Sequence, residues 1–295
     1  MGVRGTACAV VLVAMLLVSG CGTGPRGAQS STGPGAGLSS MVGGRPSIAI
    51  PSDALVFSDL QTEAGNWRSF GQAPPDYADC SAPCGEASWE EIYGIADPSK
   101  SGDATMFDLN PEMPYADALF TAGLIGQNSP QRPDWKHTLL PTLHHFVYDA
   151  YFYVPKPGIT QSLEFDISDW MDGIAGMTFG HQCDHLGDGQ WDIWDNKRQE
   201  WVGTGFACKF VQGWNHVTLQ MERGPNNTLV YQTITLNGTA KTLNRSYATI
   251  AAPAGWWGLA ANYQMDSDRR GASNTTYVDD LTVAAWPGRE RQGRS

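Results

Sequence analysis

Short runs of alternating apolar and polar residues constrain the fold of this chain more than any other feature of its sequence. The segment 216–222 reads His-Val-Thr-Leu-Gln-Met-Glu, so Val217, Leu219 and Met221 fall on one face of an extended strand. Similar runs, rich in Val, Ile, Thr and aromatic residues, recur after Pro46 between clusters of Gly, Pro, Asn and Asp. Helical periodicity is hard to find there. The pattern predicts a nearly all-β domain.

Turn signals join these runs into antiparallel pairs. A turn at 224–227 precedes a run over 228–236, and Asn237-Gly238 is a two-residue hairpin signal before a short run at 241–243. Further strands are predicted at 54–60, 146–154, 163–167, 176–182, 256–265 and 277–285. These strands suffice for a sandwich of two packed antiparallel sheets. The proline-rich region 70–141 predicts long loops, with one short helix near Trp89–Tyr93.

The residues that precede this domain have a different composition. An apolar run from Ala7 to Val18 follows Arg4 and is too short to span a bilayer, which is the layout of a secretory signal. Gly, Ser, Thr, Ala and Pro dominate from Gly22 to about Pro46 and predict a flexible tether. We therefore predict a signal peptide at 1–20, the tether at 21–46, one sandwich domain at 47–287 and a disordered tail at 288–295.

The end of the apolar run carries a recognisable motif. Residues 17–21, Leu-Val-Ser-Gly-Cys, resemble the bacterial lipobox, in which an aliphatic residue and two small residues precede an invariant cysteine. The resemblance implies that Cys21 becomes a lipidated N-terminus and that the protein is extracytoplasmic, anchored by lipid to a bacterial membrane. The alternative is an ordinary signal peptide cleaved nearby, with Cys21 a chance residue.

Four cysteines remain for the domain: Cys80, Cys84, Cys183 and Cys208. An oxidising compartment favours disulfides, and proximity in sequence favours Cys80 with Cys84 and Cys183 with Cys208, although the other pairings stay open. Paired CxxC knuckles are absent, which disfavours zinc. The net charge of −11, without a basic groove, disfavours nucleic acid as a partner and favours neutral over acidic glycans.

The segment 163–169, Leu-Glu-Phe-Asp-Ile-Ser-Asp, carries the most informative acidic pattern. Alternation turns its apolar residues inward and places Glu164 and Asp166 together on the opposite face. Carboxylates at this spacing disfavour each other's ionisation, and a raised carboxyl pKa is what a general acid requires. The same two residues also fit a solvated or ion-paired polar face.

Glu164, Asp166 and Asp169 resemble the catalytic strand of laminarinases, lichenases and agarases in the concanavalin A-like lectin/glucanase superfamily. The resemblance implies a jelly-roll sandwich and a retaining glycoside hydrolase, with Glu164 as nucleophile, Asp166 as electrostatic helper and Asp169 as acid/base. Asp169 departs from the family's Glu. It also needs a β-bulge to share a face with Glu164, because five steps along a strand is an odd number.

A longer resemblance supports the same fold. The segments 146–149, 163–166, 190–195, 214–216, 264–266 and 278–280 resemble those of a group of bacterial sandwich proteins with no established activity. Sugar-binding clefts commonly combine aromatic rings with polar groups that bond hydroxyls. The candidates for substrate binding are Trp170, His181, Trp191, Trp194, Trp201 and Gln264. Trp191 also fits packing in the core, and His181 also fits a structural histidine.

Oxygen ligands are plentiful in two acidic segments. The region 184–195 and the pair Asp279-Asp280 suit a structural Ca²⁺, although no EF-hand spacing is present and the ligands themselves are unknown from sequence. No other cofactor is required. No phosphate loop, nucleophile elbow or HExxH motif is present.

We expect a monomer that binds a polysaccharide, with or without cleavage, and the alternative is a structural or adhesive surface protein.

Overall fold

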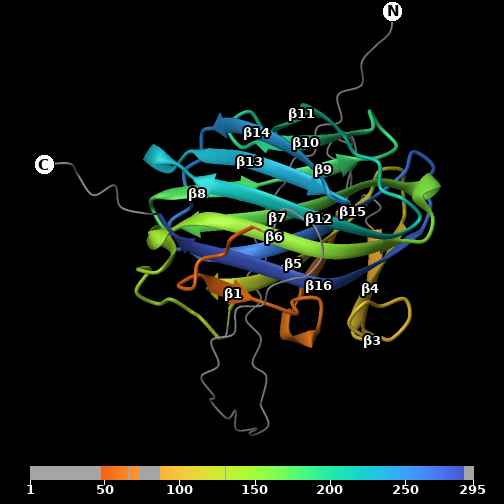
Figure 1. The fold of residues 1–295 in the computed structure, drawn as a ribbon, viewed down its shortest axis with the longest axis horizontal. Coiled ribbons are helices and arrows are strands. Elements are labelled where there is room, and N and C mark those ends of the chain that lie inside the picture. The colour runs from red at the N-terminus through yellow and green to blue at the C-terminus, as the bar shows by residue number, and fades with distance from the viewer. Residues whose placement is uncertain (1–47, 66, 73–86, 130, 289–295) are drawn as a thin grey trace, which may run out of the picture. The chain divides into compact units, whose positions relative to one another are not determined.

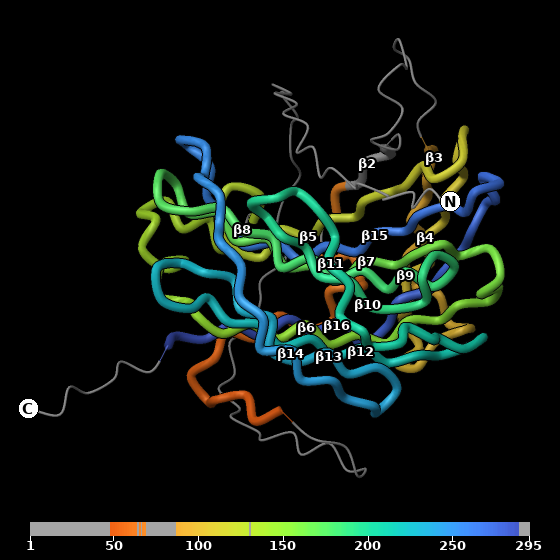
Figure 2. The backbone as a smooth tube through the Cα atoms, turned by 90° about the horizontal axis from the view of Figure 1, so that it is seen from above, coloured from red at the N-terminus to blue at the C-terminus, as the bar shows by residue number. Residues whose placement is uncertain are grey.

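The computed structural model describes residues 48–65, 67–72, 87–129 and 131–288. The predicted signal peptide, Cys21, the tether, the pair Cys80 and Cys84 and nearly all of the predicted tail lie outside these residues. The strands described between residues 55 and 287 form two antiparallel sheets, stacked as two layers (Figures 1 and 2). The predicted all-β, two-sheet sandwich is confirmed.

Sheet A is the layer with β6 and β16 near its centre (Figure 1). Its strands lie in the order β14 (Thr239–Tyr247), β13 (Leu229–Leu236), β12 (Gly213–Arg223), β6 (Leu143–Val154), β16 (Asn274–Pro287), β4 (Ala104–Pro111) and β3 (Ala87–Ile95), and β1 (Leu55–Phe57) also pairs with β16.

Sheet B is the second layer, with β7 and β15 near its centre (Figure 2). Its order is β11 (Glu200–Ala207), β10 (Gln190–Asp195), β9 (His181–Asp184), β7 (Thr160–Met171), β15 (Gly258–Ser267), β5 (Asp117–Gly126) and β2 (Arg68–Gln72), and β8 (Ala175–Phe179) also pairs with β7. Short 3₁₀ helices η1 (Glu63–Gly65), η2 (Leu140–Thr142), η3 (Pro157–Ile159) and η4 (Pro225–Asn227) lie in the connections. None of the described helices has the length and apolar character needed to cross a membrane.

Aromatic rings fill the space between the sheets. The ring of Phe165 on β7 lies 5.1 Å from Phe152 on β6, 5.5 Å from Tyr263 on β15 and 6.1 Å from Trp191 on β10, between ring centroids. Alternation along β7 therefore turns its apolar residues into the core, as the sequence predicts. The same holds on β12, where every second residue from Val217 is buried.

The predicted hairpin at residues 237–238 is confirmed. Leu236 pairs with Thr239, and Asn237 and Gly238 have φ of 50° and 82°. Both residues occupy the left-handed region that a type I′ turn requires, which explains the Asn-Gly sequence.

The region 70–141 differs from its prediction. The segment predicted as a short helix, Trp89–Tyr93, lies within β3, and β4 and β5 follow where long loops were expected. The residues Trp-Glu-Glu-Ile-Tyr have an apolar spacing that suits a helix, but pairing of β3 with β4 along most of its length overrides this local preference.

A disulfide joins Cys183 at the end of β9 to Cys208 just after β11, with Cα atoms 5.4 Å apart. Both side chains are fully buried. The bridge confirms the predicted pairing of Cys183 with Cys208. It closes a loop over a sequence separation of 25 residues, which limits the conformations of the unfolded chain.

Removing this disulfide should lower stability without changing the fold. We expect the Cys183→Ala/Cys208→Ala variant to lose about 3 kcal/mol of unfolding free energy, because the open loop gains entropy when the chain unfolds. Urea denaturation measures the loss. Added reductant should destabilise the wild type more than the variant, and equal stability of the two proteins under oxidising conditions would contradict the prediction.

Candidate functional site

The outer face of sheet B, which points away from sheet A, carries a row of polar residues from neighbouring strands. Glu164 on β7 lies opposite Gln182 on β9 and Gln264 on β15, and Asp166 lies opposite Asn262. Directly opposed residues in antiparallel strands share one face of the sheet. Glu164, Asp166 and Gln264 therefore come together on one face, as the sequence predicts for the two acids.

Two glutamine amides link Glu164 to a second carboxylate, Asp266. Gln264 Nε2 donates to Glu164 Oε1 and to Asp266 Oδ1, each over 3.0 Å. Gln182 Nε2 donates to Glu164 Oε1 at 3.2 Å and to Asp266 Oδ2 at 3.3 Å. Ser162 also donates its hydroxyl to Asp266. We call Ser162, Glu164, Gln182, Gln264 and Asp266 the acid–amide cluster.

Burial and mutual repulsion hold protons on these carboxyl groups. Burial raises the pKa of Glu164 well above its usual range, and the nearby charges of Asp266, Asp166 and Asp117 raise it further against the hydrogen bond from Gln182. Burial raises the pKa of Asp266 to about 6 despite its hydrogen bonds from Ser162, Gln264 and Gln182. The glutamine amides are neutral donors, so their hydrogen bonds lower these pKa values less than a nearby cation would. The cluster can therefore both donate and accept hydrogen bonds near neutral pH.

Asp166 has a similar environment on the same strand. Burial raises its pKa to about 7, although its Oδ1 accepts the backbone N–H of His181 at 2.9 Å. The second oxygen of Glu164, Oε2, is buried and has no hydrogen-bond partner among the described residues. Glu164 and Asp166 are only 1% and 3% exposed, so their carboxyl groups lie beneath the surface of this face.

Asp169 does not join this group. The register of β7 against β15 and β8 is unbroken from Glu164 to Asp169, so the required β-bulge does not form and Asp169 points into the core. Its side chain is buried, and neither carboxyl oxygen has a hydrogen-bond partner among the described residues. Burial raises the pKa of Asp169 to about 7 against the opposing charge of Arg223. The structure therefore separates Asp169 from Glu164 and Asp166.

The tryptophan candidates divide between the two faces of sheet B. Asp192 lies opposite Gln182, so Trp194, two residues further along β10, shares the outer face, and Trp201 on β11 lies opposite Trp194. The rings of Trp194 and Trp201 meet edge to face at 5.1 Å, with Trp194 buried and Trp201 half-buried.

Trp170 is also half-buried and shares the outer face, at the other end of β7, where its ring meets that of Trp256 at 6.5 Å. Trp191 is fully buried among the core aromatics. It directly precedes Asp192, whose side chain lies on the outer face, so the side chain of Trp191 points inward. Trp191 is therefore a packing residue and not part of the outer face.

His181 also lies in the core. Its ring is fully buried and meets Tyr231 of sheet A at 5.0 Å. Burial lowers the pKa of His181 to about 3, so the ring is neutral at physiological pH. Its ring is therefore not positioned to bind a substrate on the outer face. Only its backbone N–H contributes there, through the bond to Asp166.

The two acidic segments differ in what they can hold. Asp184, Asp188 and Asp192 bring carboxylate oxygens within 4.8 Å of one another. Asp279, by contrast, accepts hydroxyl and backbone donors from the loop 99–101, which hold its pKa below its usual range against the effect of burial. Asp279 therefore ties that loop to β16 and has little capacity left for an ion.

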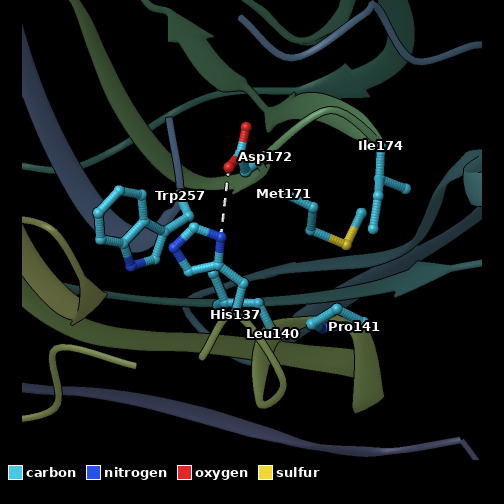
Figure 3. Close-up of a pocket in the computed structure, with 7 residues that line it drawn as sticks. All are labelled: His137, Leu140, Pro141, Met171, Asp172, Ile174 and Trp257. Carbon is cyan, nitrogen blue, oxygen red and sulfur yellow. Dashed lines mark ion pairs between the residues drawn. The ribbon is translucent and has the colours of Figure 1, made fainter. Parts of the chain in front are cut away.

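A small pocket lies apart from the predicted site residues. It is lined mainly by apolar side chains around His137, whose Nδ1 lies 3.3 Å from Asp172 Oδ2 and whose ring packs on Trp257 at 4.1 Å (Figure 3). None of the residues predicted for catalysis or substrate binding lines it. We therefore place the candidate site on the outer face of sheet B.

No protein-family model and no curated protein matches this chain. Solved structures resemble it at low identity. One, described as a carbohydrate-binding module of the β-sandwich superfamily, has a TM-score of 0.34 and 11% identity over 74% of this chain, which spans only 56% of that structure. A carbohydrate esterase from the Shiga toxin-encoding bacteriophage phi24B has a TM-score of 0.39 and 13% identity, covering 75% of this chain and 90% of its own.

A structure described as a native glycosidic hydrolase has a TM-score of 0.37 and 10% identity, covering 82% of this chain and 99% of its own. These likenesses are too distant to assign an activity to this chain.

The sequence missed three members of the acid–amide cluster: Ser162, Gln182 and Asp266. Asp266 could have been predicted from the sequence, because it follows Gln264 by two residues and must lie on the same face of the strand. Gln182 lies in the four-residue strand β9, His-Gln-Cys-Asp, whose composition does not reveal which face is buried. Its position depends on the pairing of β9 with β7.

Neutralising Asp169 should reduce the pH dependence of stability. Folding raises its pKa from 3.8 to about 7, so the folded state retains a proton that the unfolded chain has already released. The protonated carboxyl group of Asp169 therefore makes its full contribution to folding stability below about pH 4. This contribution falls as the pH rises to about 7 and then levels off. Between pH 5 and pH 8 this decline amounts to roughly 3 kcal/mol, and we expect Asp169→Asn to remove it.

Urea denaturation at pH 5 and pH 8 measures the effect, and Glu90→Gln on the exposed surface of β3 is the control. A decline with pH that is equal in Asp169→Asn and the wild type would show that Asp169 is not the group responsible.

Proposed function

We propose that the outer face of sheet B binds a neutral polysaccharide. The observation that carries this proposal is that Trp170 and Trp201, both half-buried, share one face with the acid–amide cluster. Aromatic rings stack on the apolar faces of sugars, and amide and carboxyl groups bond their hydroxyls. Trp194, buried against Trp201, fixes the orientation of that ring. The net charge of −11 favours a neutral glycan.

Cleavage of the bound glycan is a second candidate, supported by the raised pKa of Glu164. A carboxyl that retains its proton can donate it to a glycosidic oxygen, with a nearby carboxylate stabilising the positive charge that develops on the sugar. Asp166 or Asp266 would supply that carboxylate, since Asp169 lies on the other face. Glycan binding without cleavage needs none of these roles and remains the leading proposal.

Export and lipid anchoring complete the proposal. The signal-like segment and the lipobox-like residues 17–21 support attachment of lipid at Cys21 and an extracytoplasmic location on a bacterial membrane. Mass spectrometry of the mature N-terminal peptide tests this directly. A diacylglyceryl mass on Cys21 is expected, and cleavage elsewhere with an unmodified Cys21 would contradict it.

Replacing the half-buried ring of Trp201 should weaken glycan binding. We expect Trp201→Ala to reduce affinity for a neutral polysaccharide roughly five- to thirtyfold, because one stacked ring contributes on the order of 1–2 kcal/mol. Affinity electrophoresis against a panel of neutral and acidic polysaccharides measures it. Trp89→Ala, which removes an exposed ring from sheet A, is the matched control. Failure of the wild type to bind any polysaccharide would favour a structural or adhesive role.

The same panel distinguishes binding from cleavage. If the protein is a glycanase, reducing ends should be released by the wild type and lost in Glu164→Gln, which keeps the shape of the side chain but removes its proton transfer. Binding without release of reducing ends by the wild type would leave a lectin-like function.

A further inference from the structure

The turn between β9 and β10 gathers three carboxylates beside the candidate site. Asp184 ends β9, Asp188 lies in the turn and Asp192 lies in β10, on neighbouring strands of sheet B (Figure 2). One oxygen from each lies within 4.8 Å of the others. Three carboxylates this close repel one another, and a bound cation would relieve that repulsion.

The loop is built around the first of these carboxylates. Asp184 Oδ1 accepts Gln161 Nε2 at 2.8 Å and the backbone N–H of Gly187 at 3.2 Å, and Asp184 Oδ2 accepts the N–H of Asp188 at 3.1 Å. A Cβ at residue 187 would lie 1.9 Å from Asp184 Oδ2, so only glycine allows this close approach. The loop therefore holds Asp184 and Asp188 in fixed positions.

Asp192 is the observation that points to a ligand. The residue is only 7% exposed, and its buried oxygen Oδ1 has no hydrogen-bond partner among the described residues. No Lys, Arg or His in the described part of the chain forms an ion pair with Asp184, Asp188 or Asp192. A buried carboxylate without a partner is unfavourable, whereas a bound cation satisfies it.

We infer that Asp184, Asp188 and Asp192 form a Ca²⁺-binding site. The donors are all oxygen atoms, which excludes the nitrogen and sulfur ligands that Zn²⁺ prefers. One ligand lies in the exposed turn and one is buried in a strand, and Ca²⁺ accepts such irregular geometry more readily than Mg²⁺ does. Water completes the coordination from the exposed side at Asp188. The inference does not depend on glycan binding.

Terbium luminescence tests the site, because Trp191 and Trp194 flank Asp192 in sequence and can transfer energy to a bound Tb³⁺. In purified protein dialysed against EDTA, we expect saturable Tb³⁺ emission that Ca²⁺ displaces. Ca²⁺ should also raise the Tm by at least about 3 °C, since it binds the folded state alone.

Asp192→Asn should weaken binding at least tenfold and abolish the Tm shift. Asp188→Asn should do the same, and because Asp188 is exposed this variant keeps the test valid if Asp192→Asn does not fold. Glu200→Gln on β11 removes a carboxylate outside the site and should bind like the wild type.

The absence of Ca²⁺-displaceable emission from the folded wild type would overturn the inference. Unchanged affinity in both aspartate variants would also overturn it, as would an equal Tm shift from Mg²⁺ at the same concentration. Ca²⁺ binding by a protein that binds no polysaccharide would leave the site in place and remove only the proposed function.

Discussion

Alternation along β7 is the constraint on which the rest of the site depends. The aromatic contacts of Phe165 fix one face of this strand in the core, so Glu164 and Asp166 must lie on the other face. A slip of one residue would place both acids among the core aromatics and expose the apolar side chains. Strand β7 pairs with β9 and β8 on one side and with β15 on the other. The alternation along β7 therefore also decides that Gln182 and Gln264, which lie opposite Glu164, share its face.

The choice of partners for the buried acids sets the chemistry of the outer face. Arginine or lysine beside Glu164 would lower its pKa and fix it as a carboxylate, as a cation does for any nearby acid. Two glutamines lie there instead, each donating to both Glu164 and Asp266. The carboxyl groups therefore keep their protons more readily than they would beside a cation.

The sequence was informative where one face of a strand is clearly apolar. It predicted the faces of β7 and β12, the Asn237-Gly238 turn and the pairing of Cys183 with Cys208. It failed in the region of β3 to β5, where strand pairing overrides local spacing, and at His181, because β9 has a polar residue on each face. Burial of a histidine against Tyr231 depends on a tertiary contact with sheet A that no local pattern reveals.

The alternation of side chains along a strand also explains why two of the sequence candidates, Trp191 and Asp169, lie apart from the site. Trp191 and Trp194 are three residues apart on β10, an odd separation, so one must pack in the core while the other faces outward. Asp169 is five residues from Glu164 on an unbroken strand, and the same rule removes it from the outer face. A further acid close to Glu164, beyond Asp166 on the same strand, must therefore come from another strand. Asp266 on β15 meets this requirement, because the amides of Gln182 and Gln264 bind both carboxyl groups at once.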